Sequence, residues 1–268
     1  MSDGIITSKQ NKNVKLMKSL HQKKNREKQG LFPIEGIKSV AEALDSAIEV
    51  RFGLYSEKCL NHEKGIELVK RLIQQDVSLC QVSESILKDT VGTETPQGII
   101  VAGTVPDYSF SDISDKGNEI VLVVDGVQDP GNLGTIIRTA CAAGVKAVFL
   151  LKGTVDAYSP KVVRATMGAL FHIPLIDKYS DNEVLAFLKG NGYQVFVAHI
   201  SGSEIYYKVD IKRPVAWVLG NEGNGPGDFW IDNADQTVQI PLEGKAESLN
   251  VSVAAGILLF DTLRRDYC

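Results

Sequence analysis

The stretch 119-EIVLVVDGVQDPGNLGTIIRTA-140 decides the fold. It opens with an apolar, β-branched run, which is typical of a strand buried on both faces of a parallel sheet. A turn rich in Gly, Asp and Pro follows, and then an apolar helical segment whose cap we expect to be Asn132. Strand, turn and helix in this order predict an α/β domain with a parallel sheet.

The rest of the chain extends this pattern in both directions. A closing helix is expected from Leu249 to about Arg265, and further strands at 147–151, 172–176, 194–199, 215–219 and 237–240. Before the deciding stretch, residues 103–118 are rich in Gly, Pro, Ser and Asp and are interpreted as a linker. We therefore expect two domains, 1–105 and 117–268. In the first, a small α/β domain, we expect helices at 8–28, 36–47 and 63–75 and strands at 50–55, 77–82 and 98–102.

Composition and charge narrow the class of protein. The chain has 268 residues, 44% of them apolar and 23% charged, as in a folded globular protein. No apolar run is long enough to cross a membrane, and the amino terminus lacks the apolar core of a secretory signal, so we expect a cytoplasmic protein. The four cysteines and four histidines are scattered, which favours reduced thiols and no metal site.

Basic residues gather at the amino terminus. The net charge is −4, yet residues 1–30 hold eight basic residues and only two acidic ones. Such asymmetry indicates an anionic partner for this segment, and a solvated basic helix face explains the run equally well.

Three polar loops follow predicted strands, at the edge where open α/β sheets bind ligands. In the first, 125–138, the G-x-G-x-x-G spacing of a dinucleotide site is absent. Arg138 stands alone in an otherwise apolar helix, where it serves either a function or a surface ion pair. The second loop, 218-VLGNEGNGP-226, has glycines that allow close approach of a ligand to the backbone. The third, 240-IPLEGKAESLNVSVAAG-256, places an Asn and two Ser residues at a helix start, where Ser248 alone is explained as a cap.

Together these loops resemble the three signature motifs of SpoU (TrmH-like) RNA 2′-O-ribose methyltransferases, in the same order. Asn132, Gly134, Arg138 and Thr139 match N-x-G-x-x-x-R-T, residues 219–226 match the L-G-N-E motif, and residues 248–254 match S-L-N-V-S-x-A. The segment 159–170 is also similar to family sequence. Ile34-Glu-Gly and Thr95-Pro-Gln-Gly-Ile99 resemble the substrate-binding domain often fused to the catalytic one.

The resemblance implies a SPOUT fold. This is a parallel α/β domain with a deep trefoil knot, preceded by a small RNA-binding domain similar to a ribosomal protein that binds bent RNA. It also implies a homodimer whose active site is completed across the interface. S-adenosylmethionine is the implied cofactor and methyl donor, and no metal is needed. Its expected contacts are Leu219, Gly220, Asn221, Gly223, Ile240, Ser248, Leu249 and Asn250.

The implied chemistry is attack of a ribose 2′-hydroxyl on the activated methyl group. The family assigns activation of the hydroxyl to its motif-one arginine, here Arg138. A guanidinium is a donor with a pKa above about 12, so a phosphate clamp is the easier role, with the proton passing to a substrate phosphate or to Glu222. Asn132, Glu222 and Asn250 are expected to organise this arginine and the substrate.

RNA contacts are expected from the basic amino-terminal segment and from one arginine of the second half. Arg164 is interpreted either as a phosphate contact or as a member of an ion pair. The full set of expected contacts is Lys9, Lys12, Lys23, Lys24, Arg26 and Arg164.

The preferred acceptor is large-subunit, 23S-type ribosomal RNA, because the extra domain resembles those on ribosomal-RNA enzymes. A transfer-RNA 2′-O-methyltransferase, or a catalytically silent RNA-binding protein of the same fold, is the alternative. A nucleotide-binding oxidoreductase is disfavoured by the missing glycine motif, and a base methyltransferase by Arg138. The sequence does not identify the modified nucleotide.

Overall fold

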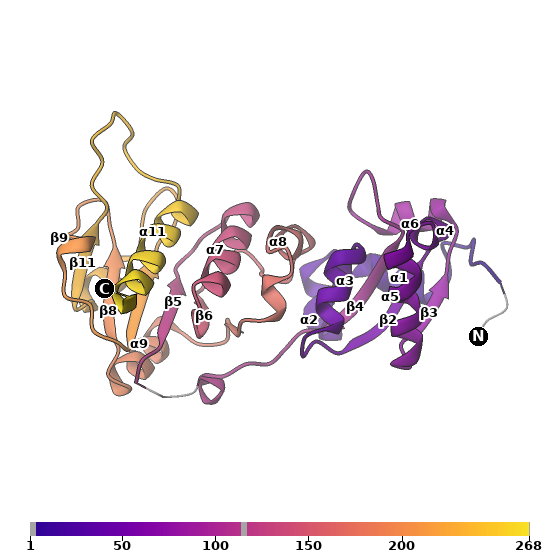
Figure 1. The fold of residues 1–268 in the computed structure, drawn as a ribbon, viewed down its shortest axis with the longest axis horizontal. Helices are drawn as coiled ribbons and strands as arrows, with labels where there is room; N and C mark the ends of the chain where they lie inside the picture. The colour runs from indigo at the N-terminus through magenta and orange to yellow at the C-terminus, as the bar shows by residue number, and fades with distance from the viewer. Residues whose placement is uncertain (1–3, 114–116, 268) are drawn as a thin grey trace. The chain divides into compact units, whose positions relative to one another are not determined.

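The computed structural model describes residues 4–113 and 117–267 of the chain, and Figure 1 labels its helices and strands. By internal contacts the chain forms two compact units. The first consists of Met1–Pro106 and Tyr158–His172, and the second of Asp107–Ala157 and Ile173–Cys268. The contacts thus group 158–172 with the first unit, while the expected domains, 1–105 and 117–268, remain a prediction.

The first unit is built on a four-stranded sheet in the order β1-β4-β2-β3. Its strands are β1 (Leu31–Glu35), β2 (Val50–Tyr55), β3 (Ser78–Gln81) and β4 (Ile99–Thr104). β4 pairs antiparallel with β1 and β2, and β2 pairs parallel with β3. The sequence does not predict β1, which contains Pro33; an edge strand tolerates a proline because its outer side needs no donor.

Helices cover this sheet: α1 (Lys12–Ser19), α2 (Lys23–Gln29), α3 (Ile37–Leu44), α4 (Glu57–Leu60), α5 (Glu63–Gln74), α6 (Glu84–Thr90) and α8 (Pro160–Ala165). The single basic helix expected at 8–28 is wrong. The chain turns after α1 because Leu20 enters the core beside Met17. Nη1 of Arg26 donates to the Leu20 carbonyl oxygen at 2.7 Å and so fastens this break.

The segment 158–172 packs against β1 of the same unit. The Phe32 ring centroid lies 4.9 Å from that of Tyr158 and 6.4 Å from that of Phe171. Arg164 Nη1 lies 3.7 Å from Glu35 Oε2. Residues 158–172 are therefore held in the first unit by both apolar and charged contacts.

The second unit contains a seven-stranded sheet in the order β7-β6-β5-β10-β8-β11-β9. All neighbouring strands are parallel, which confirms the predicted class of sheet. The strands are β5 (Ile120–Val124), β6 (Ala147–Leu150), β7 (Leu175–Ile176), β8 (Gln194–Ala198), β9 (Glu204–Ile205), β10 (Val215–Leu219) and β11 (Gln236–Gln239). β5 and β10 are adjacent, with Leu219 beside Val124, so their carboxyl ends lie together.

Both faces of this sheet are covered. Val121, Val123 and Val218 share a core with residues of α9 (Asp181–Gly190) and α10 (Asp228–Asn233). Because side chains alternate along a strand, Trp217 points to the opposite face. On that face α7 (Pro130–Ala142) and α11 (Val251–Arg264) lie side by side (Figure 1).

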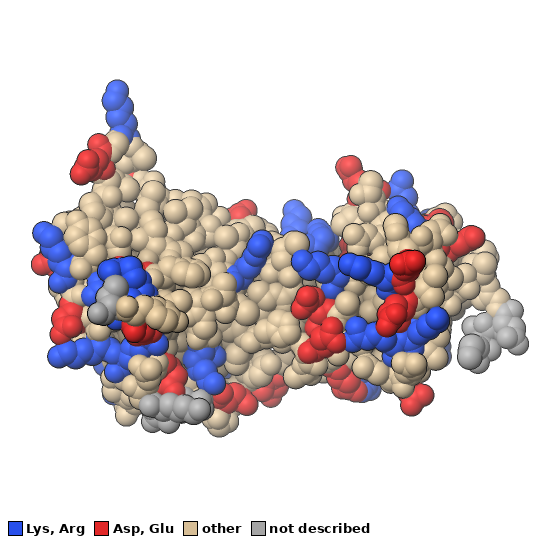
Figure 2. Space-filling model, viewed as in Figure 1, with Lys and Arg blue, Asp and Glu red and all other residues tan. Residues whose placement is uncertain are grey.

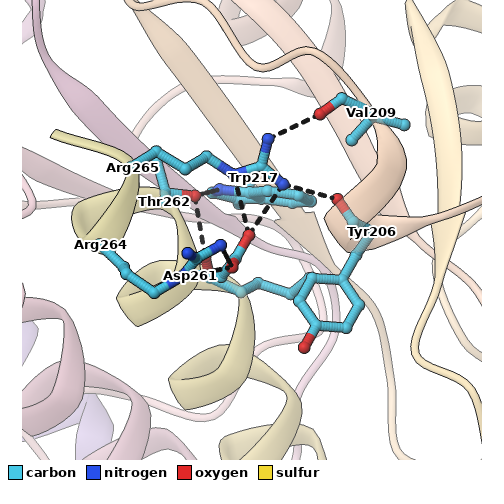
Figure 3. Close-up of polar contacts among 8 residues, drawn as sticks. Tyr206, Val209, Trp217, Asp261, Thr262, Arg264 and Arg265 are labelled. Carbon is cyan, nitrogen blue, oxygen red and sulfur yellow. Dashed lines mark hydrogen bonds and ion pairs between the residues drawn. The ribbon is translucent and has the colours of Figure 1, made fainter. Parts of the chain in front are cut away.

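The carboxyl end of α11 is fastened to the sheet and to the loop after β9 (Figure 3). Trp217 Nε1 donates to Thr262 Oγ1 at 2.9 Å. Asp261 accepts from Arg265 at 2.9 Å, and the same guanidinium donates to the carbonyl oxygens of Val209 and Tyr206 at 2.7 and 3.1 Å. These contacts fix the helix that follows the third polar loop. The trefoil knot itself remains a prediction of the family resemblance.

The expected linker at 103–118 is partly ordered. β4 continues to Thr104, and a short 3₁₀ helix, η1 (Phe110–Asp112), follows. The Phe110 ring stacks between two rings of the second unit, with centroids 3.8 Å from Tyr179 and 4.4 Å from Phe187. The connection is thus anchored to the second unit just before residues 114–116, which lie outside the described part of the chain.

Candidate active site

The three polar loops meet at the carboxyl edge of the second unit's sheet. One loop follows β5, the next follows β10, and the third follows β11 and leads into α11. All three strands are parallel and lie in one sheet, so their following loops emerge at one edge. The expected location of the polar residues is therefore the one observed.

Asn132 does not cap its helix, contrary to expectation. Asp129 is the cap of α7, and its Oδ1 accepts from the Asn132 backbone N at 2.8 Å. Pro130 occupies the first helical position, where its missing N–H is harmless. The Asn132 side chain is thereby free to reach across, and its Nδ2 donates to Glu222 Oε1 at 3.1 Å.

Glu222 is the centre of the network. Its carboxylate also accepts from the backbone N–H groups of Gln128 and Asp129, each at 3.2 Å. Burial of the Glu222 carboxyl raises its pKa, but the hydrogen bonds from Asn132 and the backbone outweigh burial, and the pKa lies below its ordinary value. Glu222 is therefore held as a carboxylate that joins the second loop to the first.

Asn250 adds the third loop. Its Nδ2 donates to Asn132 Oδ1 at 2.8 Å, across 118 residues of sequence. Its Oδ1 accepts from the backbone N and the hydroxyl of Ser252, at 2.8 and 2.6 Å. Asn250, rather than Ser248, is thus the cap of α11, and all three loops are connected through Asn132.

The second loop is folded tightly on itself. Asn221 and Gly225 exchange backbone hydrogen bonds of 3.0 and 2.9 Å. The Asn221 side chain accepts from the Gly223 N–H at 2.9 Å and donates to the Gly126 carbonyl oxygen at 2.7 Å. Any side chain at Gly220 would collide with the loop, because its Cβ would lie 1.8 Å from the Pro226 nitrogen. The Asn221 amide therefore shapes the loop.

The remaining expected cofactor contacts border these loops. Leu219 is buried, Ile240 and Leu249 are half-buried, and Ser248 is exposed. Within the described residues, the backbone groups of 241–248 form no hydrogen bonds with the protein. Apolar side chains beside free backbone donors and acceptors fit a cofactor with an adenine ring. The structure thus supplies suitable groups for S-adenosylmethionine.

Arg138 lies on the exposed side of α7, on the same helix as Asn132. No described residue forms a hydrogen bond or ion pair with its guanidinium. Of the two interpretations of Arg138, a function or a surface ion pair, the second finds no support among the described residues. All five of its N–H groups are available to an external anion.

The basic residues of the first unit differ in their placement. Lys9, Lys12, Lys23 and Lys24 are exposed; of these, Lys9 pairs with Asp89 at 3.3 Å and Lys23 with Glu27 at 3.7 Å. Figure 2 shows Lys and Arg mixed with Asp and Glu over the first unit, without one continuous basic patch on that face.

The two arginines among the expected RNA contacts differ from the lysines. Arg26 is only 4% exposed, and its guanidinium is directed to the Leu20 carbonyl oxygen, so it is a structural residue. Arg164 pairs with Glu35. Of its two interpretations, a phosphate contact or an ion pair, the structure fits the second. The burial of Arg26 is not apparent from the sequence, because a basic residue in a charge run gives no sign of its burial.

Sequence reasoning missed the backbone of the first loop. Gly126 supplies a carbonyl oxygen, and Gln128 and Asp129 supply N–H groups to the second loop. Backbone donors carry no residue-type signal, although the glycine-rich turn indicated close approach. Among the described residues, no cluster of His, Cys, Asp or Glu is suited to hold a metal ion. No helix within 4–113 or 117–267 is long and apolar enough to span a membrane.

Comparison with known proteins matches both parts of the chain. Residues 119–260 match the SpoU rRNA Methylase family, and residues 11–101 match the MRM3-like substrate binding domain. The 23S rRNA (guanosine(2553)-2′-O)-methyltransferase RlmP of Bacillus subtilis is 37% identical over 95% of this chain and 97% of its own length.

Two solved structures share the fold. The AdoMet-bound rRNA methyltransferase from Sinorhizobium meliloti matches with a TM-score of 0.89 and 32% identity, covering 99% of this chain and 98% of that one. The SpoU methyltransferase AviRb from Streptomyces viridochromogenes, in complex with AdoMet, matches with a TM-score of 0.86 and 25% identity, covering 96% of this chain and 99% of that one.

A parallel α/β unit whose three motif loops are joined at one sheet edge, with a substrate-binding unit before it, defines an S-adenosylmethionine-dependent RNA 2′-O-ribose methyltransferase. The chain belongs to the SpoU rRNA Methylase family. Membership confirms the resemblance drawn from the motifs, and it excludes the oxidoreductase and the base methyltransferase.

The Glu222 network predicts a pH-dependent contribution to stability. A carboxyl with a lowered pKa stabilises the fold above its unfolded pKa and loses this contribution as pH falls through the folded pKa. Near neutral pH, Glu222→Gln should lower the free energy of unfolding by less than about 1 kcal/mol, since the group is partly exposed. The difference in free energy of unfolding between the variant and the unaltered protein should become smaller below about pH 4.

Urea denaturation at both pH values measures this difference, with Glu243→Gln as the matched control in an exposed loop of the same unit. The same deficit at both pH values would contradict the assigned role of the Glu222 charge.

Proposed function

We propose that the chain methylates a ribose of large-subunit, 23S-type ribosomal RNA in the cytoplasm. The observation that carries the proposal is the Asn132–Glu222–Asn250 network, which joins all three motif loops at one edge. The ribosomal acceptor is supported by the name of the Bacillus relative, which covers nearly the whole chain. A transfer RNA is the alternative acceptor.

Cofactor binding is proposed at the second and third loops. Leu219, Gly220, Asn221 and Gly223 are proposed to hold S-adenosylmethionine on one side, and Ile240, Ser248, Leu249 and Asn250 on the other. The apolar members would cover the adenine face, and free backbone groups would read its edge. When bound, the sulfonium group supplies a methyl that is already activated for transfer.

Arg138 is proposed to orient the acceptor ribose. Its guanidinium is exposed and free of internal partners, so it can clamp a substrate phosphate through paired donors. It is too weak an acid to exchange protons, and Glu222 is engaged by three donors that stabilise its charged form. A substrate phosphate is therefore the favoured proton acceptor, with Glu222 and Asn132 as positioning residues.

A homodimer is proposed through the α7–α11 face. Val253 and Phe260 of α11 are 50% and 47% exposed and lie seven residues apart, hence on one side of the helix. An apolar stripe beside the helix that carries Arg138 fits the interface that the family resemblance implies. A second copy there could complete the site around Arg138.

RNA capture is proposed for exposed lysines of α1 and α2 and for Lys9, which precedes α1. Among the described residues, Lys12 and Lys24 have no acidic partner, and Lys9 and Lys23 have only exposed pairs, which cost little to exchange for phosphate. The match of residues 11–101 to a substrate-binding domain supports this location. Arg26 is left out because it is buried. Arg164 is left out because its partner Glu35 is only 10% exposed, unlike the more exposed partners of Lys9 and Lys23.

Replacing Arg138 tests the proposed chemistry. Arg138→Ala should reduce methyl transfer to 23S ribosomal RNA by at least about 100-fold, because ribose positioning is lost, while S-adenosylmethionine binding persists. Radiolabelled transfer with nucleoside digestion measures it, and the product should be a 2′-O-methylnucleoside. Lys208→Ala, an exposed basic residue of the same unit, is the control. Cofactor binding without transfer to any RNA by the unaltered chain would favour the silent RNA-binding alternative.

Charge removal on α1 and α2 tests RNA capture. The double variant Lys12→Ala/Lys24→Ala should weaken RNA binding and reduce the slope of log affinity against log salt by about 2, one for each lost phosphate contact. Filter binding over a salt series measures the slope. Lys64→Ala/Lys70→Ala on α5 is the matched double variant and should leave it unchanged. Equal slopes for all three proteins would place the RNA elsewhere.

A charge placed on α11 tests the dimer. Phe260→Glu should convert the protein to monomers and lower methyl transfer at least about ten-fold, since a buried unpaired carboxylate opposes association. Sedimentation velocity and the transfer assay report the two effects. Ile73→Glu on α5, where the wild-type side chain is 46% exposed, should change neither. A fully active monomer would rule out a shared active site.

A further inference from the structure

Asp125 follows β5 directly and has no role in the chemistry described above. Its backbone N donates to the Leu219 carbonyl oxygen at 2.8 Å. Its carboxylate Oδ2 accepts from the Gly227 backbone N, also at 2.8 Å. Leu219 and Gly227 flank the loop 220–226. One residue therefore bonds to both ends of the second motif loop.

The loop between these ends is a closed body. Asn221 and Gly225 exchange backbone hydrogen bonds in both directions, and a Cβ at Gly220 would overlap the backbone of Gly225 and Pro226. Such a loop has little freedom to deform internally. Its position relative to the sheet is consequently set by how its two ends are held.

The carboxyl-terminal end of the loop, at Gly227, depends on Asp125 more than the amino-terminal end, at Leu219, does. Leu219 belongs to β10 and is fixed by the sheet. Gly227 is the N-cap of the six-residue helix α10, and its own backbone N–H is one of the donors that the helix leaves without a partner. The carboxylate of Asp125 is the acceptor for this N–H. A Cβ at Gly227 would lie 3.3 Å from Asp125 Oδ2, so the glycine permits this close approach.

The acceptor oxygen matters here more than the negative charge. Burial raises the pKa of Asp125, the Gly227 N–H opposes that shift, and the nearby Asp181 adds to it. A half-buried carboxyl near another carboxylate gains little from being ionised. A neutral side chain of the same shape should therefore serve equally well.

We propose that Asp125 is a positioning residue that fixes the loop 220–226 for S-adenosylmethionine. The proposal rests on the proposed function, which places the cofactor against Leu219, Gly220, Asn221 and Gly223. No contact with the cofactor or the RNA is assigned to Asp125. It acts through the Gly227 hydrogen bond, by which the loop is held in one place before the cofactor arrives.

Two variants and two readouts test this role. Asp125→Ala should weaken S-adenosylmethionine binding, measured by calorimetry, about ten-fold or more, because the hydrogen bond that fixes Gly227 is lost. Hydrogen exchange of the cofactor-free protein should show faster exchange of the 220–227 amides. Asp125→Asn should keep both the cofactor affinity and the exchange rates of the unaltered protein, since the Asn Oδ1 can accept from the Gly227 N–H. Asp125→Ser, too short to reach Gly227, should behave like Asp125→Ala and serves if that variant folds poorly.

The matched control is Asp235→Ala. Asp235 Oδ2 accepts from the Val195 backbone N at 2.7 Å, near the amino end of β8, away from the motif loops. Its loss should leave the cofactor dissociation constant unchanged. Equal weakening by Asp235→Ala, or unchanged binding and exchange in Asp125→Ala, would overturn the positioning role. Failure of the unaltered chain to bind S-adenosylmethionine would instead overturn the proposed function.

Discussion

The carboxylate of Glu222 is the interaction on which the proposed site depends. It accepts hydrogen bonds from Asn132, ninety residues earlier in the chain, and from the backbone of Gln128 and Asp129. Asn132 in turn accepts from Asn250 at the start of α11. Three segments that are distant in sequence thus share one hydrogen-bonded network. Without the charged acceptor, the three donors around it would lose their common partner, and the first and second loops would lose this connection.

Sheet order makes this meeting possible. β5 and β10 are neighbours in register, so the loops that follow them start side by side. Both strands are fully buried and apolar, and this burial holds their polar termini at the sheet edge. At the carboxyl end of α11, the Trp217–Thr262 hydrogen bond and the Arg265 contacts hold this helix against the sheet and the loop after β9 (Figure 3). The third loop therefore lies between two fixed elements, β11, which pairs with β8, and α11.

The sequence predicted the elements whose own residues determine them. The apolar runs of β5 and β10 indicated buried parallel strands, and the glycine-rich loops indicated the edge where they meet. The prediction from the sequence was wrong or incomplete where tertiary contacts determine the local structure. The basic segment bends because Leu20 enters the core, and the strand β1 forms despite Pro33 because it lies at an edge. Asp129 and Asn132 are both good caps; in the structure Asp129 caps α7 and the Asn132 side chain bonds to Glu222 instead.

The most direct measurement of the central claim is a crystal structure of the chain with S-adenosylhomocysteine, the product form of the cofactor. The account predicts the ligand between Leu219–Gly223 on one side and Ile240 and 248–250 on the other, with the Asn132–Glu222 and Asn132–Asn250 hydrogen bonds retained. A ligand bound at another edge of the sheet, or a Glu222 carboxylate released from Asn132 in the complex, would contradict it.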